Sequence, residues 1–422
     1  MNFPLTAYVP LWFPLPSETF IFREVLTLRR LGMPIKVYTL YGEKLKNCSP
    51  EMLAEAQNVR RLGLKALPYL LSDLCWWFNH DRAKVLALAR EVLARRWCSL
   101  EVAGESWWAF LAGFRLARLF AADGVGHIHA PWSGGPATAA WVASRLTGIP
   151  FSMAGRAGDI YPPDGALTEK IRDALFVRTN NLANVGYLAS QAGGDPSKIN
   201  LVYNSLTVAN NGQSPVAMTP PYKLMAVGRF ARTKGFDVLL GACAILKAQN
   251  FPFKLTLVGA GFTGLKLRLL RLRLSLETQV DMPGFLPHDR MAELLATQDM
   301  MVVPSVVHST GDRDGIPNVI MEALSHRLPV VATDVCGIPE VIRHGETGLI
   351  APQNDPQALA QAIRDMAGNR DRALAMAEAG QALVAGMFDP QANAQKLFDL
   401  FKSKLGVMAP GNDHGGAPEA GR

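Results

Sequence analysis

Two cations five residues apart stand out in this sequence of 422 residues. Arg229 and Lys234 follow an apolar segment that ends at Val227, and they precede a helical pattern that starts near Phe236. A strand, a short loop and a helix in this order would bring both cations to one end of the strand. A guanidinium group offers a bidentate fork and an ammonium group a compact point charge, which together suit a diphosphate. The pair therefore indicates a diphosphate site, although the same spacing also fits two surface cations.

A pair of acids follows further along the chain. Asp314 and Glu322 are eight residues apart, and Pro317 between them is suited to the first turn of a helix that would carry Glu322. The backbone amides from Ile316 onward could meet a phosphate or a sugar hydroxyl, as the N-terminus of a helix does. The pattern predicts that both carboxylates face the same cleft as the two cations.

The elements that must position these residues alternate between short apolar runs and helical patterns. We predict strands over residues 6–13, 35–40, 126–129 and 150–153 in the first half, and over 223–227, 253–258, 300–304 and 329–333 in the second. Alternation of this kind predicts an α/β protein with parallel sheets wrapped by helices. Two such units would place a ligand cleft between them.

The domain organisation follows from the same pattern. We predict an N-terminal Rossmann-like domain over 1–208, with a Trp-rich helical insertion at about 66–120, and a linker over 209–221. A second domain is predicted over 222–389, a closing helix over 390–405 and a disordered tail over 406–422.

The charge and cysteine content of the sequence restrict the kinds of partner and cellular compartment to be expected. Lys and Arg number 43 against 36 Asp and Glu, and the first 120 residues hold 16 against 10, so +6 of the +7 net charge lies there. This asymmetry favours an anionic partner such as a membrane surface or a phosphorylated substrate. No pattern typical of nucleic-acid binding is present, and we expect no nucleic-acid partner. Five scattered cysteines indicate neither a disulfide framework nor a zinc site. The N-terminus lacks a secretory signal, so we expect a cytoplasmic protein. No stretch reaches about 18 uncharged apolar residues, so we expect no membrane-spanning helix.

The order of the motifs resembles that of family 4 retaining glycosyltransferases, which have the GT-B fold of two Rossmann-like domains facing across a cleft. The motifs are Gly-Arg-Phe-x3-Lys-Gly-Phe-Asp at 228–237, Leu-Val-Gly-Ala-Gly at 257–261, Gly-Phe at 284–285, the acidic pair, Gly-Ile-Pro-Glu-Val-Ile at 337–342 and Gly-x-Thr-Gly at 345–348. The resemblance is strong over 222–400. In the first half, the weaker segments 13–21, 127–129 and 158–161 look like the branch that builds bacterial exopolysaccharides such as colanic acid and amylovoran.

The resemblance implies transfer of a sugar from a UDP- or GDP-linked donor, with retained anomeric configuration and with no metal or other cofactor. Arg229 and Lys234 would neutralise the leaving diphosphate, Glu322 would hydrogen-bond the ribose and Asp314 would contact the donor sugar. Helix 390–405 would cross back to the first domain. The other donor-site residues that it implies are Gly228, Gly261, Gly315, Ile316, Pro317, Asn318 and Glu340. Glu340 could equally cap the helix that follows it.

Two positions depart from the family pattern. Asp314 is one methylene shorter than the usual Glu, which would alter the geometry of the sugar contact. Arg156 stands where many relatives carry a His near the sugar. An arginine cannot act as a general base, but it can donate hydrogen bonds to a sugar hydroxyl or an anionic group.

The acceptor side is less sharply defined by the sequence. The candidates are Ser17, Glu18, Thr19, His129, Arg156 and Asp159. Ser17 could instead cap the helix that follows it, and a structural role is the simpler interpretation of His129.

The resemblance also implies an acceptor carried on a polyprenyl diphosphate, met at the inner face of the cytoplasmic membrane. The Trp-rich segment 67–120 has interspersed arginines and would suit contact with anionic lipid, although packing of helices in the first domain explains it too. The alternatives within the fold are a sugar-nucleotide epimerase and a phosphorylase. From another class comes a catalytically silent subunit that recruits other transferases.

Overall fold

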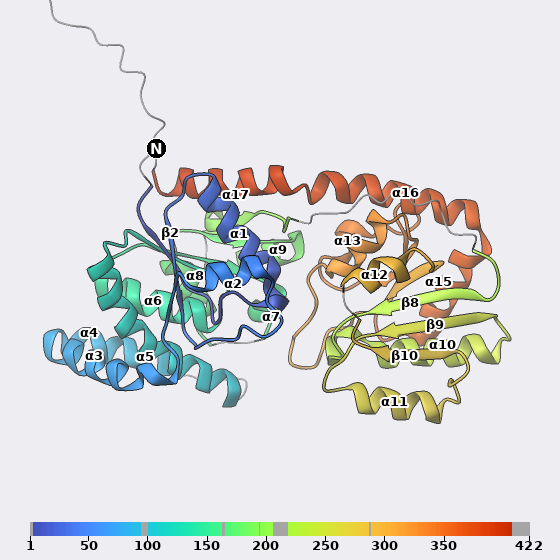
Figure 1. Ribbon diagram of the computed structural model, residues 1–422, viewed down its shortest axis with the longest axis horizontal. Coiled ribbons are helices and arrows are strands. Elements are labelled where there is room, and N and C mark those ends of the chain that lie inside the picture. Colours follow the sequence, from blue (N-terminus) through green and yellow to red (C-terminus); the bar gives the residue numbers. More distant parts are fainter. Residues whose placement is uncertain are drawn as a thin grey trace, which may run out of the picture.

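The computed structural model describes residues 3–93, 100–162, 165–193, 195–205, 218–286 and 288–406. They form two halves side by side, each built on a parallel β-sheet with helices packed around it (Figure 1). The predicted α/β class and the pair of Rossmann-like units are therefore confirmed. The linker and tail predicted over 209–221 and 406–422 lie almost entirely outside the described residues.

The first half contains a seven-stranded sheet in the order β3-β2-β1-β4-β5-β6-β7, with every neighbouring pair parallel. Successive strands are added to one side of β1 up to β3 and then to its other side from β4 onward, so the strand order reverses between β1 and β4. Ligands of such sheets bind at the carboxyl ends of the strands beside this reversal. The strands are β1 (Thr6–Tyr8), β2 (Ile35–Thr39), β3 (Val59–Arg61), β4 (His127–Ala130), β5 (Phe151–Gly155), β6 (Val177–Thr179) and β7 (Ile199–Leu201).

The predicted insertion forms three helices, α3 (Leu67–His80), α4 (Arg82–Leu93) and α5 (Leu100–Asp123). Helix α5 packs closely on α6 (Gly135–Thr147), because a Cβ at Gly113 would lie 2.5 Å from Cγ1 of Val142. The other helices of this half are α1 (Thr19–Arg30), α2 (Pro50–Ala56), α7 (Ala157–Ile160), α8 (Leu167–Asp173) and α9 (Leu182–Gln191). In the described part of the chain, no helix has both the length and the apolar character needed to cross a bilayer.

The second half contains a six-stranded parallel sheet in the order β10-β9-β8-β11-β12-β13, which reverses between β8 and β11. Its strands are β8 (Tyr222–Val227), β9 (Phe253–Val258), β10 (Val280–Gly284), β11 (Met300–Val303), β12 (Val330–Thr333) and β13 (Leu349–Ala351). Its helices are α10 (Phe236–Ala248), α11 (Gly264–Arg273), α12 (His288–Leu295), α13 (Asn318–Ser325), α14 (Ile338–Val341), α15 (Pro356–Gly368) and α16 (Arg370–Met387).

The last helix, α17 (Pro390–Lys404), leaves the second half and runs along the first (Figure 1). Its apolar side chains Leu397, Phe398 and Phe401 are buried in a core cluster with side chains of β1, β2 and α1. The ring of Phe401 lies 5.2 Å from that of Phe176. The C-terminal helix thus completes the core of the N-terminal half and ties the two halves together.

We expect Phe401→Ala to destabilise the first half by about 3–5 kcal/mol, since Phe401 is fully buried and its removal leaves a cavity. Chemical denaturation of the whole chain measures this loss. The control is Lys396→Ala on the exposed side of the same helix, which should stay within about 0.5 kcal/mol of the wild type. Equal effects of the two variants would contradict the proposed packing.

Candidate active site

The two cations predicted from the sequence lie at the carboxyl end of β8. Arg229 lines a cavity between the two halves, and no other described side chain forms an ion pair or hydrogen bond with its guanidinium group. The stem of Lys234 packs over the backbone of Gly228, because a Cβ added there would lie 3.4 Å from its Cδ and Cε. The strand end therefore presents both cations in one place.

Glycines allow the loop after β8 and the loop after β9 to touch. Gly259 and Gly261 have φ of 148° and 156°, and a Cβ at Gly261 would lie 2.5 Å from the carbonyl oxygen of Phe230. A side chain at either position would push the two loops apart. The Leu-Val-Gly-Ala-Gly motif thus supports the loop that carries the cations.

Asp314 is engaged by Lys234 rather than directed into the cavity. Its Oδ1 lies 2.9 Å from Nζ of Lys234, and its Oδ2 accepts a hydrogen bond of 2.6 Å from the Ser305 hydroxyl. Both side chains are mostly buried. The short acidic side chain therefore fixes the ammonium group, and its expected contact with the donor sugar stays a prediction.

The segment between the two acids meets the first half of the molecule. A Cβ at Gly315 would lie 3.0 Å from Nδ2 of Asn181, and Pro317 is the N-cap residue of α13, which begins at Asn318. Glu322 lies one turn into α13 and is partly exposed. Ile316 packs against Gly337, where a Cβ would lie 2.8 Å from its Cγ1. The predicted donor-site segment thus lies at the interface between the halves.

Glu340 contacts the opposite half of the molecule. Its Oε1 accepts hydrogen bonds from the backbone amides of Leu182 (2.7 Å) and Ala183 (3.3 Å), at the N-terminus of α9. Its Oε2 accepts a bond of 2.8 Å from the Tyr203 hydroxyl. Burial raises the pKa of this carboxyl. Capping of the following helix is therefore wrong as an interpretation, because Glu340 caps a helix of the other half.

The cavity that Arg229 lines has a volume of about 370 Å³ and takes residues from both halves. Asp159, one of the acceptor-side candidates, is among them, and so is Asp312, which the sequence analysis did not select. Burial, followed by the nearby charge of Asp314, raises the pKa of Asp312. The sequence feature that could have identified Asp312 is its position two residues before Asp314. The remaining lining residues are Leu11, Val102, Glu105, Ser106, Trp132, Gly134, Gly135, Pro136, Gly158 and Pro162.

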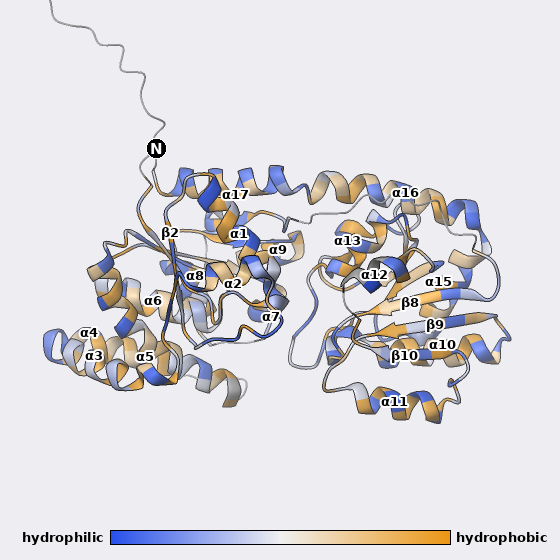
Figure 2. Ribbon diagram, in the orientation of Figure 1, coloured by the Kyte–Doolittle hydropathy of each residue, from blue (hydrophilic) through white to orange (hydrophobic). Residues whose placement is uncertain are grey.

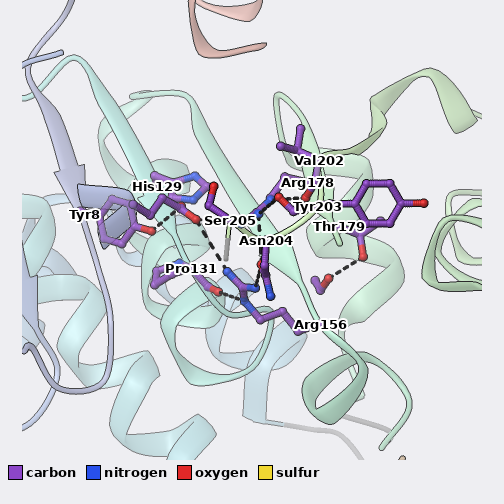
Figure 3. A network of polar contacts seen from close by, with 12 residues as sticks. Tyr8, His129, Pro131, Arg156, Arg178, Thr179, Val202, Tyr203, Asn204 and Ser205 are labelled. Carbon is purple, nitrogen blue, oxygen red and sulfur yellow. Dashed lines mark hydrogen bonds and ion pairs between the residues drawn. The ribbon is translucent and has the colours of Figure 1, made fainter. Parts of the chain in front are cut away.

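Arg156 is not among the residues that line this cavity, and its side chain extends toward Pro131 and Asn204 within the first half (Figure 3). Its Nη1 donates a hydrogen bond of 2.9 Å to Oδ1 of Asn204, and its guanidinium carbon lies 4.4 Å from the ring centroid of Phe20. Arg156 contacts two residues that line the cavity: its backbone N–H donates to Oδ1 of Asp159 at 2.7 Å, and its guanidinium carbon lies 5.4 Å from the ring centroid of Trp132. The expected hydrogen bond from Arg156 to a sugar has no counterpart in this arrangement.

The network around Arg156 holds two cations and one acid. Glu24 accepts hydrogen bonds from Arg178 (2.8 Å) and from the Tyr8 hydroxyl (2.7 Å), and it lies 3.8 Å from Nη2 of Arg156. These side chains are almost completely buried. Burial and the charge of Arg178 lower the pKa of Arg156 to about 10. The network joins α1, β1, β6 and the residue that follows β5.

Of the other acceptor-side candidates, His129 is a core residue. Its Nδ1 lies 2.8 Å from the Ser152 hydroxyl, and its ring packs against those of Phe176 and Phe401. Burial, with the charges of two arginines nearby, lowers the pKa of His129 to about 3, so the ring is neutral at physiological pH. This environment agrees with the structural interpretation.

The segment with Ser17, Glu18 and Thr19 lies at the start of α1. The N-cap residue of α1 is Glu18, without a side-chain cap, so the prediction that Ser17 caps this helix is wrong. Ser17 and Thr19 are exposed, and none of the three lines the cavity. Glu18 reaches it indirectly, since it accepts a hydrogen bond of 3.4 Å from Nε1 of Trp132.

We expect Glu24→Gln to destabilise the protein by about 3–5 kcal/mol, because it leaves two buried guanidinium groups without their shared carboxylate. The matched control is Glu55→Gln, which removes a partly exposed ion pair with Arg29 and should cost about 0–1 kcal/mol. Chemical denaturation of both variants gives the comparison. Similar losses for the two variants would show that the buried network is unimportant.

Comparisons with known proteins agree with this architecture. Residues 210–383 match the family model of glycosyl transferases group 1, and the chain therefore carries a glycosyl transferase group 1 domain. It is 34% identical to the putative colanic acid biosynthesis glycosyltransferase WcaL of Salmonella typhimurium over 43% of this chain and 45% of that protein. It is 30% identical to the amylovoran biosynthesis glycosyltransferase AmsK of Erwinia amylovora over 50% of each chain. The chain thus spans about half the length of these relatives.

Solved structures share the whole fold at low sequence identity. Alr3699/HepE of Anabaena, solved in complex with UDP and glucose, superposes with a TM-score of 0.68 at 17% identity, over 94% of this chain and 99% of that one. Sucrose-phosphate synthase of Thermosynechococcus elongatus gives a TM-score of 0.70 at 19% identity, over 96% of this chain and 100% of that one. The fold is GT-B, as the motifs predicted.

Proposed function

We propose that this chain is a retaining glycosyltransferase that moves a sugar from a UDP- or GDP-linked donor to an acceptor during synthesis of a surface polysaccharide. The observation that carries the proposal is the position of Arg229, which lines the cavity between the halves and forms no ion pair or hydrogen bond with the described side chains, although its charge acts on the Asp312 carboxylate in the same cavity. Lys234 packs over Gly228, the residue before Arg229. The group 1 domain supports sugar transfer, and the names of WcaL and AmsK support the polysaccharide pathway.

The chemistry that we propose needs stabilisation of a leaving diphosphate. As the bond from the sugar C1 to the phosphate oxygen breaks, negative charge grows on the diphosphate, and Arg229 and Lys234 would stabilise it electrostatically. The two cations would supply this charge compensation without a metal ion. Helix α13, which carries Glu322, would bind the ribose of the donor.

Retention would come from attack on the same face of the donor sugar. The acceptor hydroxyl oxygen forms its bond to C1 while its proton passes to an oxygen of the departing diphosphate. The engagement of Asp314 by Lys234 and Ser305 supports this route, because an ion-paired carboxylate is a poor covalent nucleophile. The contacts that Glu340 makes across the interface would help to exclude water from the reaction.

We further propose that the acceptor is carried on a polyprenyl diphosphate and is met at the inner face of the cytoplasmic membrane. The inserted helices expose large apolar side chains to solvent, among them Trp76 and Trp107, at 43% and 52% exposure. Hydrophobic and hydrophilic residues are interspersed along the ribbons of α3, α4 and α5 (Figure 2). One of these rings has an arginine beside it, since the guanidinium carbon of Arg118 is 5.0 Å from the ring centroid of Trp76. Aromatic rings with neighbouring cations suit the interface of an anionic bilayer.

We expect a thermal-shift panel of UDP- and GDP-sugars, without divalent metal, to raise the melting temperature with at least one donor. Arg229→Ala should weaken that binding roughly ten- to a hundredfold, because charge-assisted hydrogen bonds to the diphosphate are lost. The control is Arg364→Ala, a partly exposed cation on α15 that donates a hydrogen bond to Gln249 and should leave the shift unchanged. Absence of any shift from a folded protein would favour a catalytically silent binding subunit.

We expect the protein to sediment with vesicles that contain anionic phosphatidylglycerol and not with neutral phosphatidylcholine vesicles. Trp76→Ser with Trp107→Ser should lower the binding constant at least about tenfold, because burial of each large apolar side chain contributes about 1.5–3 kcal/mol. The matched control is Phe262→Ser, which removes an aromatic side chain with 70% exposure from the second half. Equal loss in both variants, or no vesicle binding at all, would contradict the membrane contact.

A further inference from the structure

The cavity between the halves has a wall that the inserted helices supply. Val102, Glu105 and Ser106 of α5 line it, together with the loop at Gly134 and Gly135 that follows β4. Oε1 of Glu105 accepts a hydrogen bond of 2.9 Å from the Gly135 amide, so α5 and this loop form one wall. The volume of the cavity, about 370 Å³, lies within the range of about 300–1,000 Å³ that is usual for small-ligand sites.

The charges that line this cavity are unbalanced. Three carboxylates, those of Glu105, Asp159 and Asp312, face a single cation, Arg229. Under the proposed function the donor diphosphate would pair with Arg229. The remaining charge of the lining would then be negative, which repels a second anion and favours hydrogen-bond donors.

The three carboxylates differ in how many hydrogen bonds they already accept from the protein. Asp159 accepts hydrogen bonds from the backbone amides of Ser133 and Arg156, one at each oxygen, so it holds the loops that shape the wall. Glu105 has one oxygen on the Gly135 amide. The carboxylate of Asp312 accepts a hydrogen bond from the Arg313 backbone amide and feels the charge of Arg229, but no described side chain forms an ion pair or hydrogen bond with it, so it retains acceptor capacity. Asp312 and the second oxygen of Glu105 are therefore placed to accept hydrogen bonds from a ligand, one from each half.

Apolar groups complete the lining. Trp132 and Leu11 line the cavity, with Pro136 and Pro162 nearby in its wall. Pyranose rings combine hydroxyl groups at their edge with C–H groups on their faces. A cavity that offers carboxylates and apolar surface together has the composition expected of a sugar site.

We propose that this cavity binds the acceptor sugar and that it selects a neutral, hydroxyl-rich pyranose against uronic acids and phosphorylated sugars, with Asp312 and Glu105 as the hydroxyl acceptors. The proposal rests on the proposed function and adds the substrate class of its second site. It also gives the inserted helix α5 a role in specificity.

Saturation-transfer NMR at pH 7.5, with UDP or GDP present, tests this proposal on the whole chain. The probes are the methyl glycosides of glucose, galactose and mannose, and the methyl glycosides of glucuronic and galacturonic acid. We expect binding of at least one neutral glycoside, and at least about tenfold weaker binding of the uronate that differs from it only at C6.

Asp312→Asn should reduce this discrimination between the neutral glycoside and the uronate about fivefold or more, because it removes a negative charge without removing the hydrogen-bond acceptor. Glu105→Gln should act in the same direction. The matched control is Asp371→Asn, at a side chain with 95% exposure on α16, which should leave the ratio unchanged. A variant that only perturbed the fold would weaken binding of the neutral glycoside and of the uronate alike, and the ratio of the two affinities would stay the same.

The outcomes separate this proposal from the proposed function. Uronates that bind as well as the neutral sugars, or no glycoside binding by a protein that does bind nucleotide, would overturn the neutral-acceptor proposal alone. A ratio that Asp312→Asn leaves unchanged would overturn the role of Asp312. Failure to bind any nucleotide would instead contradict the donor site.

Discussion

The interaction on which the proposed function depends is charge compensation at the end of strand β8, where we propose that a diphosphate binds. Arg229 and Lys234 lie there because β8 ends at Val227 and the chain turns sharply at Gly228. Asp314 holds Lys234 in place, whereas Arg229 forms no ion pair or hydrogen bond with the described side chains and has the Asp312 carboxylate in the same cavity. A guanidinium group that has its hydrogen-bond donors free beside a cavity is the main reason to propose an anionic ligand at that point.

The rest of the fold keeps the opposite wall of the cavity in position. Helix α17 crosses from the second half and buries Phe401 among the rings of the first. Within the first half, Glu24 of α1 pairs with Arg178 of β6 and lies near Arg156, which follows β5. Glu340 accepts hydrogen bonds at the N-terminus of α9 from across the interface. Helix α17 and Glu340 therefore connect the two halves, whereas the Glu24 network stabilises the first half.

Much of the fold could be predicted because strands buried on both faces are continuous apolar runs. Strands β8, β9, β11 and β12 were predicted on this basis, and the structure confirms them. Strands β3 and β6 were missed because they have three residues each, with charged side chains among them. The buried charge of Arg178 in β6 is paired with Glu24, which lies 154 residues away in the sequence, while the Val202 carbonyl accepts a further hydrogen bond. A pairing over this distance cannot be read from a local pattern.

The position of a site residue could be predicted where a local motif fixes the backbone geometry. It could not be predicted where contacts with residues distant in the sequence determine the direction of the side chain. The loop with Arg229 and Lys234 follows from its own residues. The direction of the Arg156 side chain depends on Asn204 and Phe20, and the availability of Asp312 depends on which neighbouring acid engages Lys234. Glu340 was selected from its motif, but its partners belong to the other half of the chain.

The most direct test of the central claim is turnover in the presence of EDTA. Each UDP- and GDP-sugar is incubated with the protein and an octyl glycoside, and proton NMR follows both the donor and the anomeric configuration of the new bond. The account predicts that one donor is consumed without metal and that the product keeps the donor's configuration. An inverted product, or turnover that begins only after a divalent cation is added, would contradict it.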